Sequence, residues 1–402
     1  MDATAPGAHT LHDRDDEPVG HGHRWITATY EVAAGADEIE AVARALATEQ
    51  SVEMPLGAIT DQRVLDEVVG RVGDIAELGP GLFRVELALA AETVGDDAVQ
   101  LANMVFGNCS LQDEVRLVEL ELPAPLLATF TGPRVGIDGL RARCAVPAGV
   151  RRALTCTAVK PQGLPPAALA ELCGRFARAG LDLIKDDHGM ADQPAAPFRQ
   201  RVEACQRAVQ RAAEDTGHTS QYVPSLVGTP QVLRDRVELC RDLGIRTVLV
   251  APSLIGWGAF RELVDDCLAG GGGSGSGSDD AVAVLAHPAF AGAARIDPPL
   301  LLGRLFRLLG ADATIFPNAG GRFSYSPVRC AAIAEAARAP WGHLAPCLPV
   351  PAGGMTTDRV GELLDFYGND VMLLIGGSLL AAGDRLEQEA HRFVATVAER
   401  AG

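Results

Sequence analysis

The stretch GLDLIKDDHGMADQ, Gly180–Gln193, carries the pattern that decides the fold. It opens with a short apolar run, LDLI at 181–184, which is typical of a buried strand. The charged segment Lys185-Asp186-Asp187-His188 follows directly, and a helix-like segment spans 197–216. An apolar strand that ends in charged side chains and leads into a helix is one βα unit of a parallel sheet.

The same unit recurs from about residue 150 to the end of the chain. The strand-like runs are 153–159, 181–184, 221–226, 246–251, 281–286, 312–316, 346–350 and 371–375. Helix-like segments between them include 165–179, 197–216, 229–243 and 359–367. Eight such units over roughly 250 residues predict a closed (β/α)8 TIM barrel rather than a doubly wound open sheet. The Gly/Ser run 270–278 predicts a flexible surface connection, because the βα rhythm resumes at once.

The chain before residue 149 follows a different pattern. Strand-like segments at 24–32, 82–90 and 115–122 alternate irregularly with helix-like segments at 36–47 and 96–105. This mixture predicts an α+β domain, an open sheet with helices on one face. We therefore expect a disordered tail at 1–22, an α+β domain at 23–148 and a TIM-barrel catalytic domain at 149–402. The tail histidines His9, His12, His21 and His23 suggest a metal-binding tract, but a solvated tail is favoured.

Composition excludes several classes of protein. Hydrophobic residues make up 48% and charged residues 22%, as in ordinary globular proteins. A net charge of −17 argues against nucleic acid and anionic membranes as partners, while leaving room for an anionic small substrate. The nine cysteines form no CxxC pair, which predicts reduced thiols. Since no signal peptide or membrane span is evident either, we expect a cytoplasmic protein.

Reactive and glycine-rich segments follow the predicted strands, where TIM barrels carry their chemistry. The residues at these strand ends are Lys160, Lys185-Asp186-Asp187-His188, His287, Asn318, Gly353-Gly354 and Gly376-Gly377. The two glycine pairs predict a phosphate site built from backbone N–H groups, or else ordinary tight turns. Lys185, Asp187 and His188 could surround a divalent cation, or could form a plain ion-pair network.

These segments resemble the RuBisCO large chain. Gly180–Gln193 is similar to its GLDFTKDDE signature, TAVKPQ (157–162) to its KPK strand end, and PVPAGGM (349–355) to its PVASGG phosphate loop. LIGGSL (374–379) resembles the last glycine loop of the family. ATEQS (47–51) and VFGN (105–108) resemble segments in which RuBisCO keeps a glutamate and an asparagine. The likeness runs from about residue 24 to the end of the chain.

The resemblance implies a role for each matching residue. Lys185 would be carbamylated by CO₂ and would bind Mg²⁺ together with Asp187, and His188 would stand at the third metal ligand. Lys160 would move the substrate proton during enolisation. His287 and Asn318 would orient the substrate, and the four glycines named above would hold its phosphate. Glu49 and Asn108 would reach the active site of a partner subunit, so a homodimer with shared active sites is expected.

Five departures argue against true ribulose-bisphosphate carboxylation. His188 stands where RuBisCO has a glutamate ligand, Gln162 where KPK has its second lysine, and Pro288 where an arginine follows the strand-five histidine. The strand-six segment IFPNAGGRF lacks the mobile lysine, and Ala352 replaces a serine. Since a second phosphate and a new carboxylate would need the lost cations, the chain resembles a type IV RuBisCO-like protein.

The expected chemistry is Mg²⁺-dependent enolisation of a small phosphorylated keto-sugar or keto-acid. We rank a decarboxylase or transcarboxylase of the 3-oxo-isoapionate 4-phosphate type in carbohydrate catabolism first. The alternative is a 5-methylthioribulose-1-phosphate isomerase or an enolase of sulfur salvage. A non-catalytic binding or regulatory protein is the alternative of another class, against which the retained Lys160, Lys185 and Asp187 argue.

Overall fold

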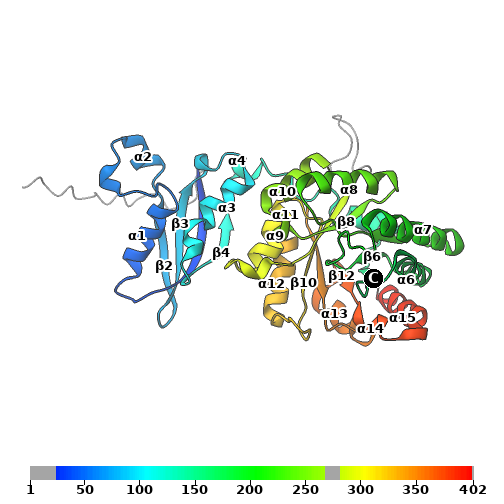
Figure 1. Cartoon of the computed structure of the whole chain (residues 1–402). Helices are drawn as coiled ribbons and strands as arrows, with labels where there is room; N and C mark the ends of the chain where they lie inside the picture. The colour runs from blue at the N-terminus through cyan, green and yellow to red at the C-terminus, as the bar shows by residue number, and fades with distance from the viewer. Residues whose placement is uncertain (1–23, 268–280, 401–402) are drawn as a thin grey trace, which may run out of the picture.

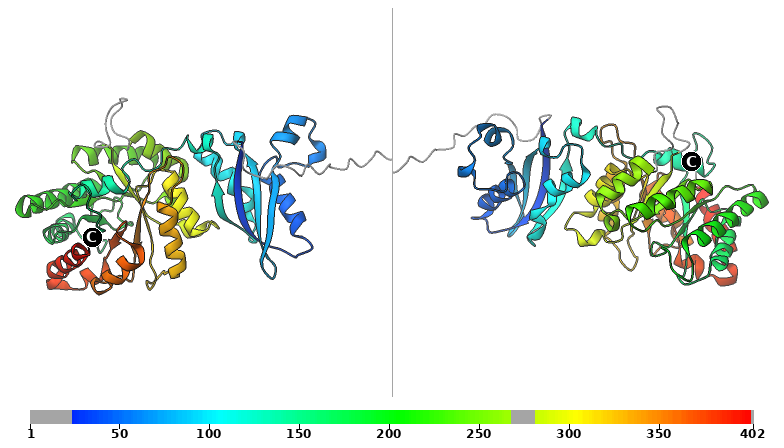
Figure 2. Two further views of the ribbon diagram at one scale, coloured as in Figure 1. Left: turned by 180° about the vertical axis from the view of Figure 1, so that it is seen from behind. Right: turned by 45° about the horizontal axis from the view of Figure 1, so that its top comes forward.

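The computed structural model describes residues 24–267 and 281–400. They form a small antiparallel sheet with its helices and, beside it, a barrel of parallel strands (Figures 1 and 2). The predicted tail at 1–22 with its histidines and the Gly/Ser run 270–278 lie outside the described residues. No helix in the described part of the chain is long and apolar enough to span a membrane.

The small sheet has the strand order β2-β3-β1-β4, and all its pairs are antiparallel. Its strands are β1 (Trp25–Ala33), β2 (Arg71–Gly79), β3 (Leu82–Ala90) and β4 (Val115–Glu121). The β4 edge meets the barrel through two backbone hydrogen bonds, Leu117 N to Arg295 O at 3.1 Å and Asp297 N to Leu117 O at 2.8 Å. Helix α1 (Ile39–Glu49) packs on β2 and β3, on the side away from the barrel (Figures 1 and 2).

The second sheet has eight parallel strands in the order β7-β6-β5-β12-β11-β10-β9-β8. The strands are β5 (Leu154–Val159), β6 (Leu183–Asp186), β7 (Gln221–Val223), β8 (Thr247–Val250), β9 (Ala283–Ala286), β10 (Ala313–Pro317), β11 (Leu348–Ala352) and β12 (Met372–Leu374). Hydrogen bonds from Leu249 N to Pro224 O (2.9 Å) and from Leu226 N to Leu249 O (2.8 Å) join the two ends of the sheet. The predicted fold class, an α+β region followed by a TIM barrel, is confirmed.

Helices cover the outside of the barrel because one face of each is apolar. In α7 the buried residues Phe198, Val202, Cys205, Val209 and Ala212 recur at helical spacing, and Gly217 ends the helix at φ 74°. The helices beyond α1 are α2 (Gln62–Glu67), α3 (Ala98–Phe106), α4 (Ala124–Leu127), α5 (Gly136–Arg143), α6 (Pro166–Arg178), α7 (Phe198–Thr216), α8 (Pro230–Asp242), α9 (Pro252–Ile255), α10 (Trp257–Glu262), α11 (Phe306–Leu308), α12 (Pro327–Arg338), α13 (Val360–Tyr367), α14 (Gly377–Leu380) and α15 (Leu386–Glu399).

Helix α5 closes the end of the barrel at which the strands begin. Its apolar residues Ile137 and Leu140 belong to one buried cluster with inward-facing strand residues such as Leu183, Leu285 and Ile315. Because side chains fill this end, the opposite end, where the strands finish, is the one left for a ligand.

The structure corrects two details of the sequence prediction. Strand β6 spans Leu183–Asp186, so Lys185 and Asp186 lie inside the strand and not after it. The prediction ended the strand at its first charge, whereas these two charges pair with β5 opposite Ala158 and Val159. Strand β2 was also missed, because most of its residues are exposed and carry no clear alternation.

Candidate active site

Three strand ends bring the predicted polar residues together. Lys160, after β5, forms an ion pair with the Asp187 carboxylate, after β6. The other Asp187 oxygen lies 3.0 Å from His188 Nδ1. The His188 ring stacks on that of His287, after β9, with centroids 4.1 Å apart and planes 11° apart. The structure therefore joins four of the predicted site residues in one chain of contacts.

Lys185 and Asp186 point to opposite sides of β6, as successive residues of a strand must. Lys185 is buried, and its Nζ donates to the Asp186 carbonyl at 2.9 Å. The Asp186 side chain accepts from Tyr222 Oη at 2.7 Å and from Ser225 N at 3.1 Å, and it pairs with Arg201 Nε at 3.2 Å. This buried support of the site was missed by the sequence analysis, although strand alternation alone predicts that Asp186 faces away from Lys185.

Burial sets the charges of the cluster. It lowers the pKa of Lys185, and it lowers the pKa of His287 to about 2, with help from the nearby Lys185. His287 is therefore neutral at ordinary pH. Since His287 Nδ1 accepts from Ala289 N at 3.1 Å, its proton sits on Nε2.

The Asp187 carboxylate stays ionised. Burial would raise its pKa, but hydrogen bonds from His188 and Lys160 hold that pKa well below its usual range. The cluster thus combines a fixed negative charge, a half-exposed lysine and a neutral imidazole. Groups of these kinds can act in general acid–base catalysis.

The same residues fit a divalent cation only under one condition. In the described part of the chain, no group of three or more His, Cys, Asp or Glu side chains has the geometry of a metal site. A hard cation such as Mg²⁺ prefers oxygen ligands, and Asp187 alone supplies a carboxylate here. A carbamate on Lys185 would add the missing oxygen, and the predicted part of His188 in that set stays a prediction.

The loops after β10 and β11 are pressed against each other. Gly353 and Gly354 have φ of 90° and 66°, and a Cβ at Gly354 would lie 2.6 Å from the Gly320 backbone. Asn318 is buried, its N donates to Ala352 O at 2.8 Å, and its Oδ1 accepts from Tyr367 Oη at 2.7 Å. Its Nδ2 has no hydrogen-bond partner among the described residues. Tyr367, far along the chain, could not have been linked to Asn318 from the sequence.

The second predicted glycine pair differs from the first. Gly376 and Gly377 stand after β12 and have no positive φ, and Gly377 begins the short helix α14. The second pair therefore does not use the positive φ that glycine permits. A Cβ at Gly376 would come no nearer than 4.0 Å to Ala158, and one at Gly377 would meet open space.

Glu49 and Asn108 contact each other in the small-sheet region. Asn108 Nδ2 donates to Glu49 Oε1 at 2.9 Å, between the end of α1 and the 3₁₀ helix η3 (Asn108–Leu111). Within the described residues, no hydrogen bond or ion pair joins either side chain to the barrel cluster. The structure therefore does not bring Glu49 and Asn108 together with the other predicted site residues.

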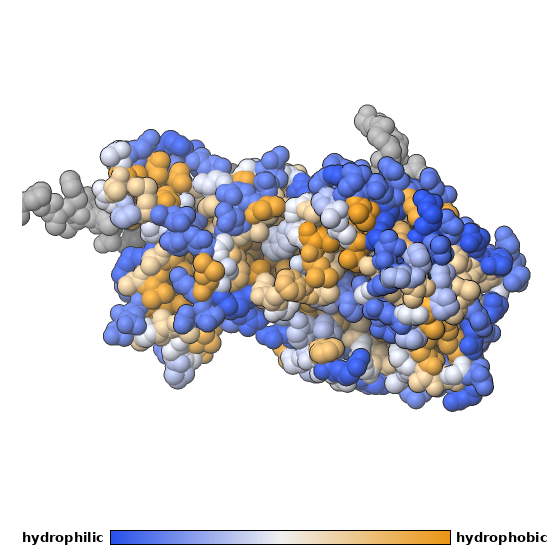
Figure 3. Space-filling model, viewed as in Figure 1, coloured by the Kyte–Doolittle hydropathy of each residue, from blue (hydrophilic) through white to orange (hydrophobic). Residues whose placement is uncertain are grey.

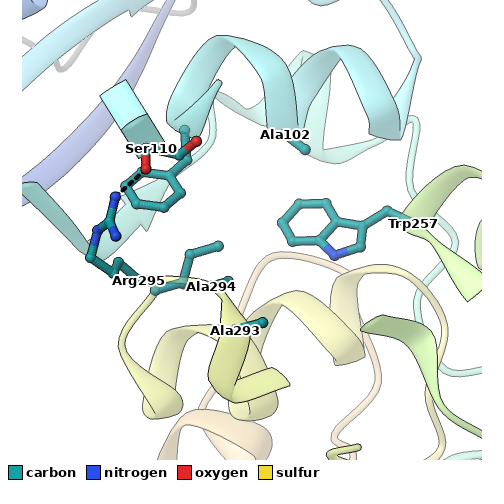
Figure 4. A pocket seen from close by; sticks show the side chains of 8 residues that line it. Ala102, Ser110, Trp257, Ala293, Ala294 and Arg295 are labelled. Atoms are coloured by element: carbon teal, nitrogen blue, oxygen red, sulfur yellow. Dashed lines mark hydrogen bonds between the residues drawn. The ribbon is translucent and has the colours of Figure 1, made fainter. Parts of the chain in front are cut away.

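A separate cavity of about 320 Å³ lies where the small-sheet region meets the barrel (Figure 4). Trp257, Ala102 and the segment Ala293–Ile296 line it, and Arg295 donates to the Ser110 carbonyl at one side. None of the predicted site residues lines this cavity. The candidate active site is the cluster at the barrel mouth.

Comparison with known proteins identifies the family. Residues 142–270, which include Lys160 and Lys185, match the family described as ribulose bisphosphate carboxylase large chain, catalytic domain. The chain is also 51% identical to the ribulose bisphosphate carboxylase-like protein 1 of Rhodopseudomonas palustris, over 93% of this chain and 97% of that protein. The chain belongs to the RuBisCO-like protein family.

Two further relatives support this membership. A 5-methylthioribulose-1-phosphate isomerase of Rhodospirillum rubrum is 53% identical, over 93% of this chain and 96% of that protein. The crystal structure of a RuBisCO-like protein from Rhodopseudomonas palustris superposes with a TM-score of 0.84 at 49% identity, and the match covers 94% of this chain and 98% of that one. The resemblance inferred from the sequence motifs is confirmed.

Proposed function

We propose that this RuBisCO-like protein is an isomerase of a phosphorylated ketose and that its substrate is 5-methylthioribulose 1-phosphate. The observation that carries the proposal is the Lys160–Asp187–His188–His287 cluster at the barrel mouth. It stands in a chain that is 53% identical to a protein named 5-methylthioribulose-1-phosphate isomerase. This reverses the order given by the sequence, which ranked decarboxylation or transcarboxylation first. The named relative favours the sulfur-salvage alternative.

The side chains suit a reaction that takes a proton from a carbon beside a carbonyl and returns one to a neighbouring carbon. Lys160, half exposed and held by Asp187, is placed to carry that proton. Neutral His287 can donate from Nε2 to a substrate oxygen without adding a second cation to the site. The backbone of Gly353 and Gly354 can approach a phosphate closely, because neither residue has a side chain.

We propose Mg²⁺ as the cofactor, bound by Asp187, by the carbamate formed from Lys185 and CO₂, and by His188 as the third candidate ligand. When bound, it would stabilise the negative charge that develops on the substrate oxygens. The support is the burial of Lys185 close to the Asp187 carboxylate.

We also propose a homodimer as the working unit, in which Glu49 and Asn108 serve the site of the partner. Their mutual hydrogen bond, away from the cluster of their own chain, supports this arrangement. We also propose the division into domains at 23–148 and 149–402, which is supported by the two separate sheets of the structure.

The test is to incubate the protein with Mg²⁺, bicarbonate and 5-methylthioribulose 1-phosphate in D₂O and to follow ¹H and ³¹P NMR. Metal-dependent rearrangement with deuterium uptake, lost in Lys185→Ala, is the expected result. A parallel tube with 3-oxo-isoapionate 4-phosphate tests the decarboxylase or transcarboxylase alternative. If only that compound reacts, the result favours this alternative. A third tube holds 2,3-diketo-5-methylthiopentyl 1-phosphate, and enol formation from that compound alone would move the assignment to an enolase. If none of the compounds exchanges a proton, the proposal fails and the non-catalytic alternative gains.

A further inference from the structure

Exposed apolar side chains are unevenly placed around the barrel. From β5 to the end of the described chain, the exposed large apolar residues are Leu254, Phe290, Phe323, Val328 and Phe366. Leu254, Phe290 and Phe323 lie on the segments directly after β8, β9 and β10, which are neighbours in the sheet. Val328 and Phe366 lie on the covering helices α12 and α13. On the face drawn in Figure 3, apolar patches are visible on the small-sheet region, at its junction with the barrel and on the barrel itself.

The other half of the mouth has the opposite character. The connections after β5, β6, β11 and β12 carry Lys160, the Asp187-His188 pair and the glycine pairs. In the loops that directly follow these strands, no large apolar side chain is exposed within the described residues; Phe366 lies further on, on helix α13. The mouth is therefore divided into a polar, glycine-rich half and an apolar half.

Phe290 ties the apolar half to the cluster. It stands three residues after His287 with 66% of its surface exposed, and its φ of 68° is rare for a bulky residue. Such strain persists only where the surroundings hold it, and it concentrates at ligand sites. The Ala289 N–H that precedes Phe290 is the one bonded to His287 Nδ1.

Phe323 ties the apolar half to the glycine loops. It is 80% exposed and follows Gly320 and Gly321, whose backbones press against Gly354 and Gly353. The Arg322 guanidinium lies 6.0 Å from the centre of the Phe323 ring. Phe323 therefore stands on the loop that borders the glycine loop after β11.

We propose that Phe290 and Phe323 bind an uncharged alkyl or alkylthio group at the end of the substrate opposite its phosphate. The inference rests on the proposed function, whose substrate has such an end, and it assigns the residues that select it. A second phosphate or a carboxylate would lose its hydration against these rings and gain little in return. The apolar half therefore selects against bisphosphates and phosphorylated keto-acids.

The first experiment measures binding of alkyl phosphates to the purified full-length protein, so that it does not depend on turnover. Affinities of inorganic, ethyl, butyl and pentyl phosphate are compared by calorimetry for the wild type, Phe290→Ala, Phe323→Ala and Phe366→Ala. Phe366 is the matched control, an exposed phenylalanine on α13 outside the two loops. We expect affinity to rise about fourfold per buried methylene in the wild type and in Phe366→Ala.

The two loop variants should lose most of that rise, and Phe290→Leu, which keeps an apolar side chain, should retain it. An equal rise in all variants, or none in the wild type, would overturn the inference. So would dissociation of a dimer in the loop variants, since the rings would then be covered by a second copy of the chain.

The second experiment compares turnover of two ketose 1-phosphates that differ only in a methylthio or a hydroxyl group at C5. We expect kcat/KM to favour the methylthio compound by about 10- to 200-fold, and the ratio to shrink in Phe290→Ala and Phe323→Ala. Turnover without an apolar preference would leave the proposed function standing and remove this inference. If affinity rises with the length of the alkyl phosphate but neither sugar phosphate is turned over, the inference stands and the proposed function fails.

Discussion

The two ends of the barrel use buried charge in opposite ways. Where the strands begin, Asp182 accepts two bonds from Arg152, at 2.8 and 2.6 Å, and two from Thr155, at 2.8 and 2.9 Å. Arg307 at the same end donates to three carbonyls. Where the strands finish, Lys160 has one partner, and Asn318 Nδ2 has none among the described residues.

The polar groups at the two ends of the barrel therefore have different roles. At the beginning of the strands, Asp182 and Arg307 are fully engaged by other groups of the protein, and their removal should cost stability. Where the strands end, Lys160 and Asn318 keep hydrogen-bonding groups that the described residues do not use, and their removal should cost activity. The predictions below test that division, from the largest expected effect to the smallest.

Lys160→Ala should lower kcat by about 10²- to 10⁴-fold, because the proposed proton carrier is lost. The melting temperature should stay within experimental error of the wild type, since the side chain is half exposed. NMR turnover assays together with calorimetry would measure both quantities. A protein that melts much earlier with kcat intact would break the comparison.

Asp182→Ala should lower the free energy of unfolding by about 3–5 kcal/mol, because Arg152 loses its partner in a buried site. Chemical denaturation measures this loss. The kcat of the folded fraction should match the wild type, and an equal loss of kcat would show that the two ends are not separable.

Asp312→Asn should cost about 1–3 kcal/mol of unfolding free energy. The Asp312 carboxylate accepts from Val135 N (2.7 Å), Gly136 N (2.8 Å) and Val284 N (2.8 Å), and an amide nitrogen would leave one of these donors unpaired. Urea unfolding gives the value. If stability is unchanged, this end of the barrel is more adaptable than its contacts suggest.

Gly354→Ala should raise KM for the phosphorylated substrate about tenfold, a change of about 1.4 kcal/mol, because its Cβ would push the Gly320 backbone away. Gly368→Ala, at the end of α13 and outside the glycine loops, is the matched control. It has a similar positive φ, but its Cβ would meet no atom within 4 Å. Equal KM changes in both variants would assign the effect to backbone strain and not to contact between the loops.

Much of this fold could be predicted from the sequence because the barrel strands are continuous apolar runs. All eight were placed within a few residues, since burial on both faces leaves a strong local pattern. Strand β2 was missed because one exposed edge strand leaves almost none. Local sequence therefore fixes elements best where their surroundings are uniform.

The site was predictable only where its residues stand in motifs. The segment Lys185–His188 and the glycine pairs were evident from the letters, and the stacking of His188 on His287 was not. That contact joins residues about a hundred positions apart and depends on the packing of β6 and β9 around the ring. The division of the mouth into polar and apolar halves likewise required the order of the strands.

The ring of strands has a consequence for how the chain is made. Strand β5 is hydrogen-bonded to β12, so the first barrel strand synthesised waits for the last one before its second edge is covered. Until residues 372–374 leave the ribosome, β5 and β11 both expose open edges, the kind of surface on which strands of other chains add. Helix α5, synthesised just before β5, already offers the growing ring an apolar base. A chain that ends after β12 can therefore close the ring of strands, whereas a chain that ends before residue 372 keeps an open sheet and is prone to aggregate.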